Sequence, residues 1–153
     1  MVRLLYNSNS ILNNELRSLF SCNLLRFNNW QGLIGKFNSW TPDGCMWILE
    51  IRANQVINFI RSGDEVTFPG VTLPVGEWAH VAVTFDGTIQ VFYINGEEVG
   101  RSEWSLCPGT DAGMRFGCDR PNGSNPFHSA LDEVMLYNWA LSDLEVLELV
   151  SNE

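Results

Sequence analysis

Two short turns, Asp86-Gly87 and Asn95-Gly96, constrain the fold of this chain more than any other feature. They separate three runs rich in β-branched and aromatic residues, at 77–85, 89–94 and 97–101. Asp-Gly and Asn-Gly are strong hairpin signals, because glycine readily adopts the positive φ that a two-residue loop needs. The pattern therefore predicts an antiparallel meander of three strands.

The first of these runs alternates between apolar and mixed positions. Successive side chains of a strand point to opposite faces, so alternate residues share a face. One predicted face carries Ala79, Val81, Val83 and Phe85, and the other carries Trp78, His80, Ala82 and Thr84. This assignment places His80 on the surface-facing side of the strand.

Further short strands are predicted at residues 33–37, 45–51, 56–60, 114–116 and 127–137. Residues 67–76, with two prolines and two glycines, are expected to form a loop or an edge segment. Ser142 and Glu145 form a capping box at the start of a C-terminal helix. Many short strands with one terminal helix predict an all-β fold, an antiparallel β-sandwich of the jelly-roll type, as a single domain over residues 1–153.

Charge and cysteine spacing exclude several functions. The formal net charge is −9 with only 9 Lys and Arg, and no basic cluster is present, which argues against nucleic-acid binding. No apolar run has the length of a membrane span, so no membrane insertion is expected. The 4 cysteines form no CxxC pair. Cys107 and Cys118 bracket a loop, and both a disulfide and separate thiols remain open.

A family resemblance rests on two segments. Residues 77–88 with 91–96, and residues 131–145, resemble the central hairpins and the closing strand of laminin-G-like, concanavalin A-like jelly rolls, the closing strand being similar also to that of pentraxins. The resemblance covers roughly residues 30–150 and implies an extracellular or cell-surface module. It also implies a structural calcium ion with Asp132 as a ligand; alternatively, Asp132 holds a backbone amide.

Residues 1–29 depart from the family pattern, because they lack its early polar turn. The first strand is therefore expected to be altered or missing. A missing strand would expose a sheet edge and permit a homo-oligomer by pairing with a second copy. No signal peptide is predicted, because polar residues interrupt the apolar stretch that one would need.

Catalysis is not expected. Glycoside hydrolases use two nearby carboxylates, and the Glu-x-Asp-x-Glu motif of related glucanases is absent. The acidic pairs Glu97-Glu98 and Asp132-Glu133 are adjacent in predicted strands, so their side chains point to opposite faces. We therefore predict that the chain is not an enzyme.

Aromatic residues beside polar loops suggest sugar binding instead. An exposed indole stacks on a pyranose ring, and Trp30, Trp40 and Trp104 each lie next to polar residues. Each of the three could instead pack in the core. Trp78 and Trp139 are expected to fill space in the core or at its edge. The predicted function is a non-catalytic, lectin-like carbohydrate-binding module, with a protein-interaction or adhesion module as the alternative. The predicted ligand-binding residues are Trp40, Asp43, His80, Arg120, Asn122 and Asn125.

Overall fold

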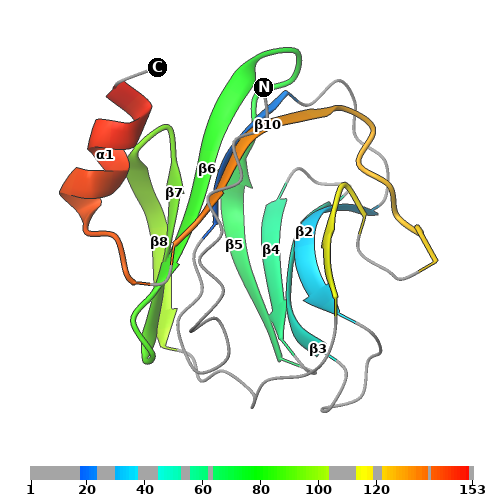
Figure 1. The fold of residues 1–153 in the computed structure, drawn as a ribbon, viewed down its shortest axis with the longest axis horizontal. Helices are drawn as coiled ribbons and strands as arrows, with labels where there is room; N and C mark the ends of the chain where they lie inside the picture. The colour runs from blue at the N-terminus through cyan, green and yellow to red at the C-terminus, as the bar shows by residue number, and fades with distance from the viewer. Residues whose placement is uncertain are drawn as a thin grey trace. The chain divides into compact units, whose positions relative to one another are not determined.

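Ten strands in two antiparallel sheets and one C-terminal helix form the described part of the chain in a computed structural model (Figure 1). The structure describes residues 18–23, 30–37, 45–52, 56–61, 64–103, 113–118, 122–137 and 139–151. This architecture confirms the predicted all-β class with one short terminal helix. The chain forms two compact units, each built on one sheet.

The first unit comprises residues 1–23, 77–105 and 131–153. Its sheet has the strand order β10-β1-β6-β7-β8. The elements are β1 (Ser18–Asn23), β6 (Trp78–Phe85), β7 (Ile89–Ile94), β8 (Glu97–Glu103), β10 (Ala130–Leu136) and α1 (Asp143–Ser151).

The two predicted turns connect β6, β7 and β8 as an antiparallel meander. Asn95 and Gly96 both have positive φ, 51° and 80°, as the mirror-image hairpin turn requires. In the other turn the Asp86 carboxylate accepts hydrogen bonds from the backbone N–H groups of Thr88 and Ile89, at 2.8 and 2.7 Å. These local bonds explain why the sequence predicted this region well.

Strand β1 lies in the N-terminal region that departs from the family pattern. It pairs antiparallel with β6 along its whole length and lies between β6 and β10. That edge of β6 is therefore covered by a strand of the same chain. The two edge strands of the sheet are β10 and β8. The charged residues of β8 discourage edge-to-edge pairing; they are Glu97, Glu98, Arg101 and Glu103.

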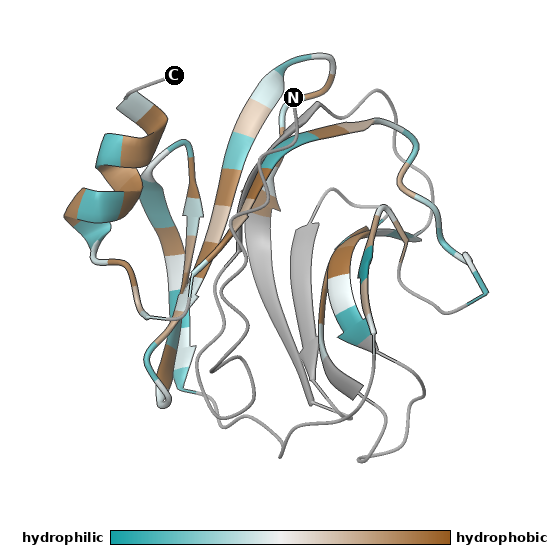
Figure 2. Cartoon of the chain, in the orientation of Figure 1, coloured by the Kyte–Doolittle hydropathy of each residue, from teal (hydrophilic) through white to brown (hydrophobic). Residues whose placement is uncertain are grey.

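Helix α1 covers one face of this sheet, next to the β7–β8 hairpin (Figure 1). A buried cluster joins Ala82 and Tyr93 of the sheet to Leu141 and Val146 of the C-terminal segment. The capping box is confirmed, because the Ser142 backbone N–H and hydroxyl both donate to the side chain of Glu145, at 2.7 and 2.8 Å. Figure 2 shows hydrophobic and hydrophilic residues alternating around the helix.

The second unit comprises residues 24–76 and 106–130. Its sheet has the strand order β5-β4-β3-β2-β9. The strands are β2 (Trp30–Phe37), β3 (Cys45–Arg52), β4 (Val56–Arg61), β5 (Asp64–Thr72) and β9 (Met114–Phe116). Strand β5 overlaps the segment 67–76 that was expected to form a loop or an edge segment, and it is an edge strand of its sheet. Its position at the sheet edge agrees with the prolines in this region.

Buried apolar side chains fill the centre of this second sheet. Trp47, Ile48, Leu49 and Ile51 of β3 are each at most 1% exposed. Consecutive buried residues show that β3 is covered on both faces. Cys107, the suggested partner of Cys118, lies outside the described residues.

Candidate functional site

The most distinctive surface feature of the second unit is Trp30, at the start of β2. Its side chain is 40% exposed. Trp30 is the register partner of Arg52 on β3, so the two side chains lie on the same face of the sheet. The Arg52 guanidinium carbon lies 4.5 Å from the centre of the indole ring, within the range of a cation–π contact. The guanidinium therefore backs one face of the indole.

A buried carboxylate holds this arginine in place. Glu50 lies two residues before Arg52 on the same strand, so both side chains point to the same face. The Arg52 Nε donates to Glu50 Oε1 at 3.1 Å, and the Glu50 side chain is completely buried. A buried carboxylate requires a charged partner, so Arg52 loses much of its freedom. The result is an exposed indole on a rigid support.

The loop at residues 122–128 is anchored beside the same end of β2. The backbone N–H of Gly32 donates to the carbonyl oxygen of Asn125 at 2.9 Å. The backbone N–H of His128 donates to the buried side chain of Gln31, also at 2.9 Å. Both contacts fall within two residues of Trp30. These bonds fasten the loop to β2, and the His128 contact lies on the face of the strand opposite to Trp30, because adjacent residues of a strand point to opposite faces.

Two predicted ligand-binding residues, Asn122 and Asn125, belong to this loop. Asn122 is exposed, and its side-chain oxygen accepts from the backbone N–H and the hydroxyl of Ser124, at 3.1 and 2.7 Å. Asn125 adopts a positive φ of 52°, a conformation that asparagine tolerates better than most residues. The other three predicted residues of this unit lie outside the described residues; they are Trp40, Asp43 and Arg120.

The prediction that His80 faces the surface is wrong. Its side chain is 5% exposed, and all of β6 after Trp78 is buried. The C-terminal segment packs on the face that carries Ala82, the next residue on the same side as His80. Burial lowers the pKa of His80, and the nearby Glu133 carboxylate opposes that shift. The turn residue Asn95 accepts from the His80 backbone N–H at 2.9 Å, so this position fastens the hairpin to β6.

The structure gives Asp132 the alternative role considered for it. Its carboxylate accepts the backbone N–H of Glu133 at 2.9 Å, and Glu133 has a positive φ of 50°. Among the described residues, no group of three or more His, Cys, Asp and Glu side chains is placed to hold a metal ion. The implied calcium ion therefore stays a prediction.

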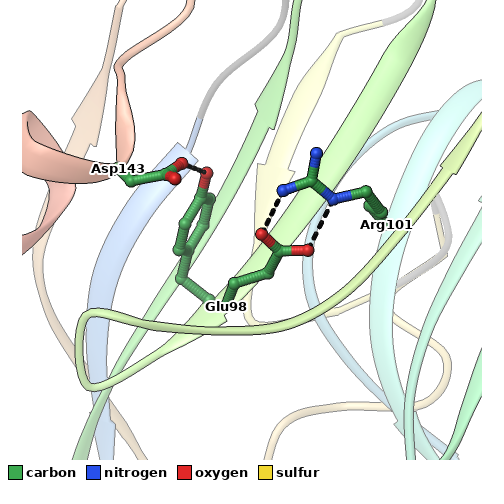
Figure 3. A network of polar contacts seen from close by, with 4 residues as sticks. Glu98, Arg101 and Asp143 are labelled. Atoms are coloured by element: carbon green, nitrogen blue, oxygen red, sulfur yellow. Dashed lines mark hydrogen bonds and ion pairs between the residues drawn. The ribbon is translucent and has the colours of Figure 1, made fainter.

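Polar contacts of the first unit link α1 to its sheet. The Tyr93 hydroxyl donates to Asp143 of α1 at 2.7 Å, and burial together with this bond raises the pKa of Tyr93 to about 12 (Figure 3). On β8, Arg101 binds Glu98 through two nitrogens, its Nε at 2.6 Å. This pair is exposed, and the arginine lowers the pKa of Glu98. These contacts have structural roles within the first unit, because they join α1 to the sheet and neighbouring residues of β8 to each other.

The remaining exposed tryptophans of the described chain lie in the first unit. Trp78 and Trp139 are 52% and 51% exposed, so neither fills the core. Trp139 meets Tyr137 edge to face, with ring centres 5.4 Å apart. The sequence analysis named Trp30 among the tryptophans beside polar residues but predicted Trp40 as the ligand-binding one. The support of Trp30 by Arg52 could not be predicted, because it depends on a strand register that the sequence does not reveal.

Similar structures share this fold at low sequence identity. A proposed carbohydrate binding protein from Bacteroides ovatus matches with a TM-score of 0.74 and 20% identity, over 91% of this chain and 41% of that one. The CBM40 of the Ruminococcus gnavus IT-sialidase matches with a TM-score of 0.72 and 17% identity, over 90% of this chain and 83% of that one. The heptameric SAP-like pentraxin from Limulus polyphemus matches with a TM-score of 0.67 and 14% identity, over 90% of this chain and 70% of that one.

The chain spans less than half the length of the Bacteroides ovatus protein. No curated protein sequence is significantly similar to it. No helix in the described residues is long and apolar enough to cross a membrane. A family model described as the Concanavalin A-like lectin/glucanases superfamily matches residues 22–147, which is most of the chain. The chain belongs to this superfamily and has its jelly-roll fold.

Proposed function

We propose that the chain is a non-catalytic glycan-binding module whose site is centred on Trp30. The observation that carries the proposal is the exposed indole backed by Arg52, which the buried Glu50 holds in turn. A rigid aromatic face binds a sugar ring with little loss of side-chain entropy. Asn122 and Asn125, on the loop that is bonded to β2 at Gly32, are the proposed amide contacts for sugar hydroxyls.

Similar structures support a sugar ligand. One is described as a proposed carbohydrate binding protein, and another is a carbohydrate-binding module of a sialidase. The superfamily also includes glucanases, and their chemistry needs two carboxylates. Among the described side chains of the second unit, Glu50 is the one carboxylate, and Arg52 neutralises it. A binding role without hydrolysis fits this arrangement better.

The test is a glycan array with the wild-type chain, run in calcium and again in EDTA. Binding that survives EDTA supports the Trp30 site as described. Binding lost in EDTA would assign Asp132 and calcium a role, to be examined with Asp132→Ala. A complete lack of binding, together with unchanged tryptophan fluorescence in the presence of polysaccharides, would contradict the proposal.

A protein-interaction module remains the second candidate, and one observation favours it. Helix α1 exposes Leu144 and Leu147, at 72% and 46%. Exposed apolar side chains grouped on one helix are a common feature of docking surfaces. If this helix were the functional surface, Leu144→Ser would abolish partner capture, whereas the glycan array would stay blank. Either function would suit a module displayed outside the cell.

A further inference from the structure

We infer that His80 is a pH-sensitive switch in the first unit, which releases the C-terminal segment (residues 131–151) from β6 when the imidazole gains a proton. The switch is independent of the proposed Trp30 site, because that site lies in the second unit. The chain has 2 histidines, and the other, His128, belongs to the second unit. His80 is therefore the one side chain of the first unit whose ordinary pKa lies between pH 5 and 8.

His80 lies on the face of β6 that the C-terminal segment covers. Its side chain is only 5% exposed. Ala82 is two residues further along the strand, so it shares this face with His80. Ala82 packs with Leu141 and Val146 of the C-terminal segment, and Met135 of β10 packs against the same cluster. The imidazole is therefore buried at the boundary between β6 and this segment.

Few charged groups surround the imidazole. The neighbouring strands β1 and β7 contain no Asp, Glu, Lys or Arg. Their titratable residues are Cys22, which pairs with Ala79, and Tyr93, whose hydroxyl donates to α1. On the C-terminal segment, the carboxylate of Glu133 attracts a proton to His80, but the Glu133 side chain is exposed to water. The other acids of the segment are bonded to other groups or exposed; they are Asp132, Asp143, Glu145 and Glu148.

A proton on His80 favours an open segment. Burial lowers the pKa of His80 below its ordinary value of 6.5, and Glu133 opposes this shift only in part, because water screens an exposed carboxylate. When the segment opens, the imidazole regains water and its ordinary pKa. The open form therefore binds more protons below about pH 6.5. The closed form has its full stability above this pH and loses stability as the pH falls below it.

Helix α1 depends on this packing for its stability. Its 9 residues are too few for a helix that is stable on its own in water. It is held by the buried Val146 side chain and by the bond from Tyr93 to Asp143. A small change in free energy on this face of β6 is therefore enough to shift the helix between closed and open forms.

Hydrogen exchange measured by mass spectrometry at pH 7.5 and pH 5.5 tests the switch on the whole chain. The protection of the α1 amides, corrected for the intrinsic pH dependence of exchange, gives the opening constant of the helix. We expect this constant to rise about threefold to tenfold at pH 5.5, because one proton changes it at most tenfold per pH unit. An unchanged constant would overturn the inference. A rise of equal size in β3 of the second unit would indicate a general effect of acid and would also overturn it.

Two matched variants assign the response to one histidine. His80→Gln keeps a neutral polar side chain but cannot gain a proton, so its opening constant should be equal at the two pH values. His128→Gln removes the other histidine and should keep the wild-type rise. A rise that persists in His80→Gln, or that disappears in His128→Gln, would assign the response to another group and contradict the inference.

Glu133→Gln provides a test that does not depend on the folding of His80→Gln. This variant removes the carboxylate that favours the proton on the closed form, so the rise at pH 5.5 should be at least as large as in the wild type. A smaller rise would show that Glu133 rather than His80 gains the proton, and would overturn the inference.

Discussion

The two units each contain an arginine–glutamate pair, and the pairs do different things. On β8 of the first unit, Arg101 and Glu98 are both exposed to solvent, at 56% and 29%. On β3 of the second unit, Glu50 is completely buried and Arg52 lies over an exposed indole. A surface pair is a weak stabiliser, whereas a buried carboxylate makes its partner indispensable. The contrast indicates that the Glu50–Arg52 pair supports the exposed Trp30 indole, whereas the Glu98–Arg101 pair only decorates the surface of β8.

The polar groups around α1 have a different role. Tyr93 and Asp143 hold the helix on the sheet, and the capping box of Ser142 and Glu145 starts that helix. Its exposed tryptophans, Trp78 and Trp139, are about as accessible as Trp30. Exposure alone therefore does not identify a binding aromatic. The distinguishing feature of Trp30 is the cation over its ring and the buried carboxylate that holds this cation.

The largest expected effect comes from breaking the buried pair. Arg52→Ala should lower the free energy of unfolding by about 3 kcal/mol, because the completely buried Glu50 carboxylate loses this charged contact. The matched control is Arg101→Ala, which removes the exposed arginine and should change stability by an amount near the error of the measurement. Urea denaturation of both variants measures the difference. Equal losses in the two variants would contradict the contrast between the pairs.

A second comparison concerns the two turn glycines of the first unit. Gly87 and Gly96 both have positive φ, but a Cβ at Gly96 would lie 3.0 Å from Leu147 Cδ1 of α1, whereas one at Gly87 would meet nothing within 4 Å. Gly87→Ala should cost about 1 kcal/mol from backbone strain. Gly96→Ala should cost about 1.5 kcal/mol, because Leu147 must also shift. Thermal unfolding of both would show whether the hairpin supports the helix, and a smaller loss at Gly96 would argue against that contact.

A smaller effect is expected for Tyr93→Phe. Losing the bond to Asp143 should cost about 1 kcal/mol at neutral pH, since the exposed carboxylate regains water. The pKa of Tyr93 rises from 10.0 to about 12 in the folded state. The extra stability is therefore fully present below pH 10 and is lost as pH rises from 10 to 12.

Denaturation at pH 7 and pH 11 measures this dependence. The stability gap between the wild type and Tyr93→Phe should narrow at the higher pH. A gap that stays constant between the two pH values would mean that folding does not raise the pKa of Tyr93.

Local features of the fold could be predicted from the sequence, and long-range ones could not. The Asn95-Gly96 turn and the Ser142 cap depend on residues within four positions of each other, so their signals lie in short segments. His80 was placed on the surface because alternation along one strand says nothing about a helix more than sixty residues later that covers its second face.

The candidate site shows the same limit. Asn122 and Asn125 were identified from composition, because amides beside glycine are typical of exposed loops. The pairing of Trp30 with Arg52 depends on the register between β2 and β3, which contains a bulge between Gly32 and Ile34. A shift of one residue would have moved Trp30 to the other face. The support of the indole was therefore beyond sequence reasoning.

Whether Trp30 forms the glycan site is tested most directly by isothermal titration of Trp30→Ala and Trp139→Ala side by side, with the tightest ligand of the array. Both variants remove a tryptophan of similar exposure, one from each unit. We expect a loss of about tenfold or more for Trp30→Ala and unchanged affinity for Trp139→Ala. Unchanged affinity in Trp30→Ala, or an equal loss in both, would contradict a glycan site at Trp30.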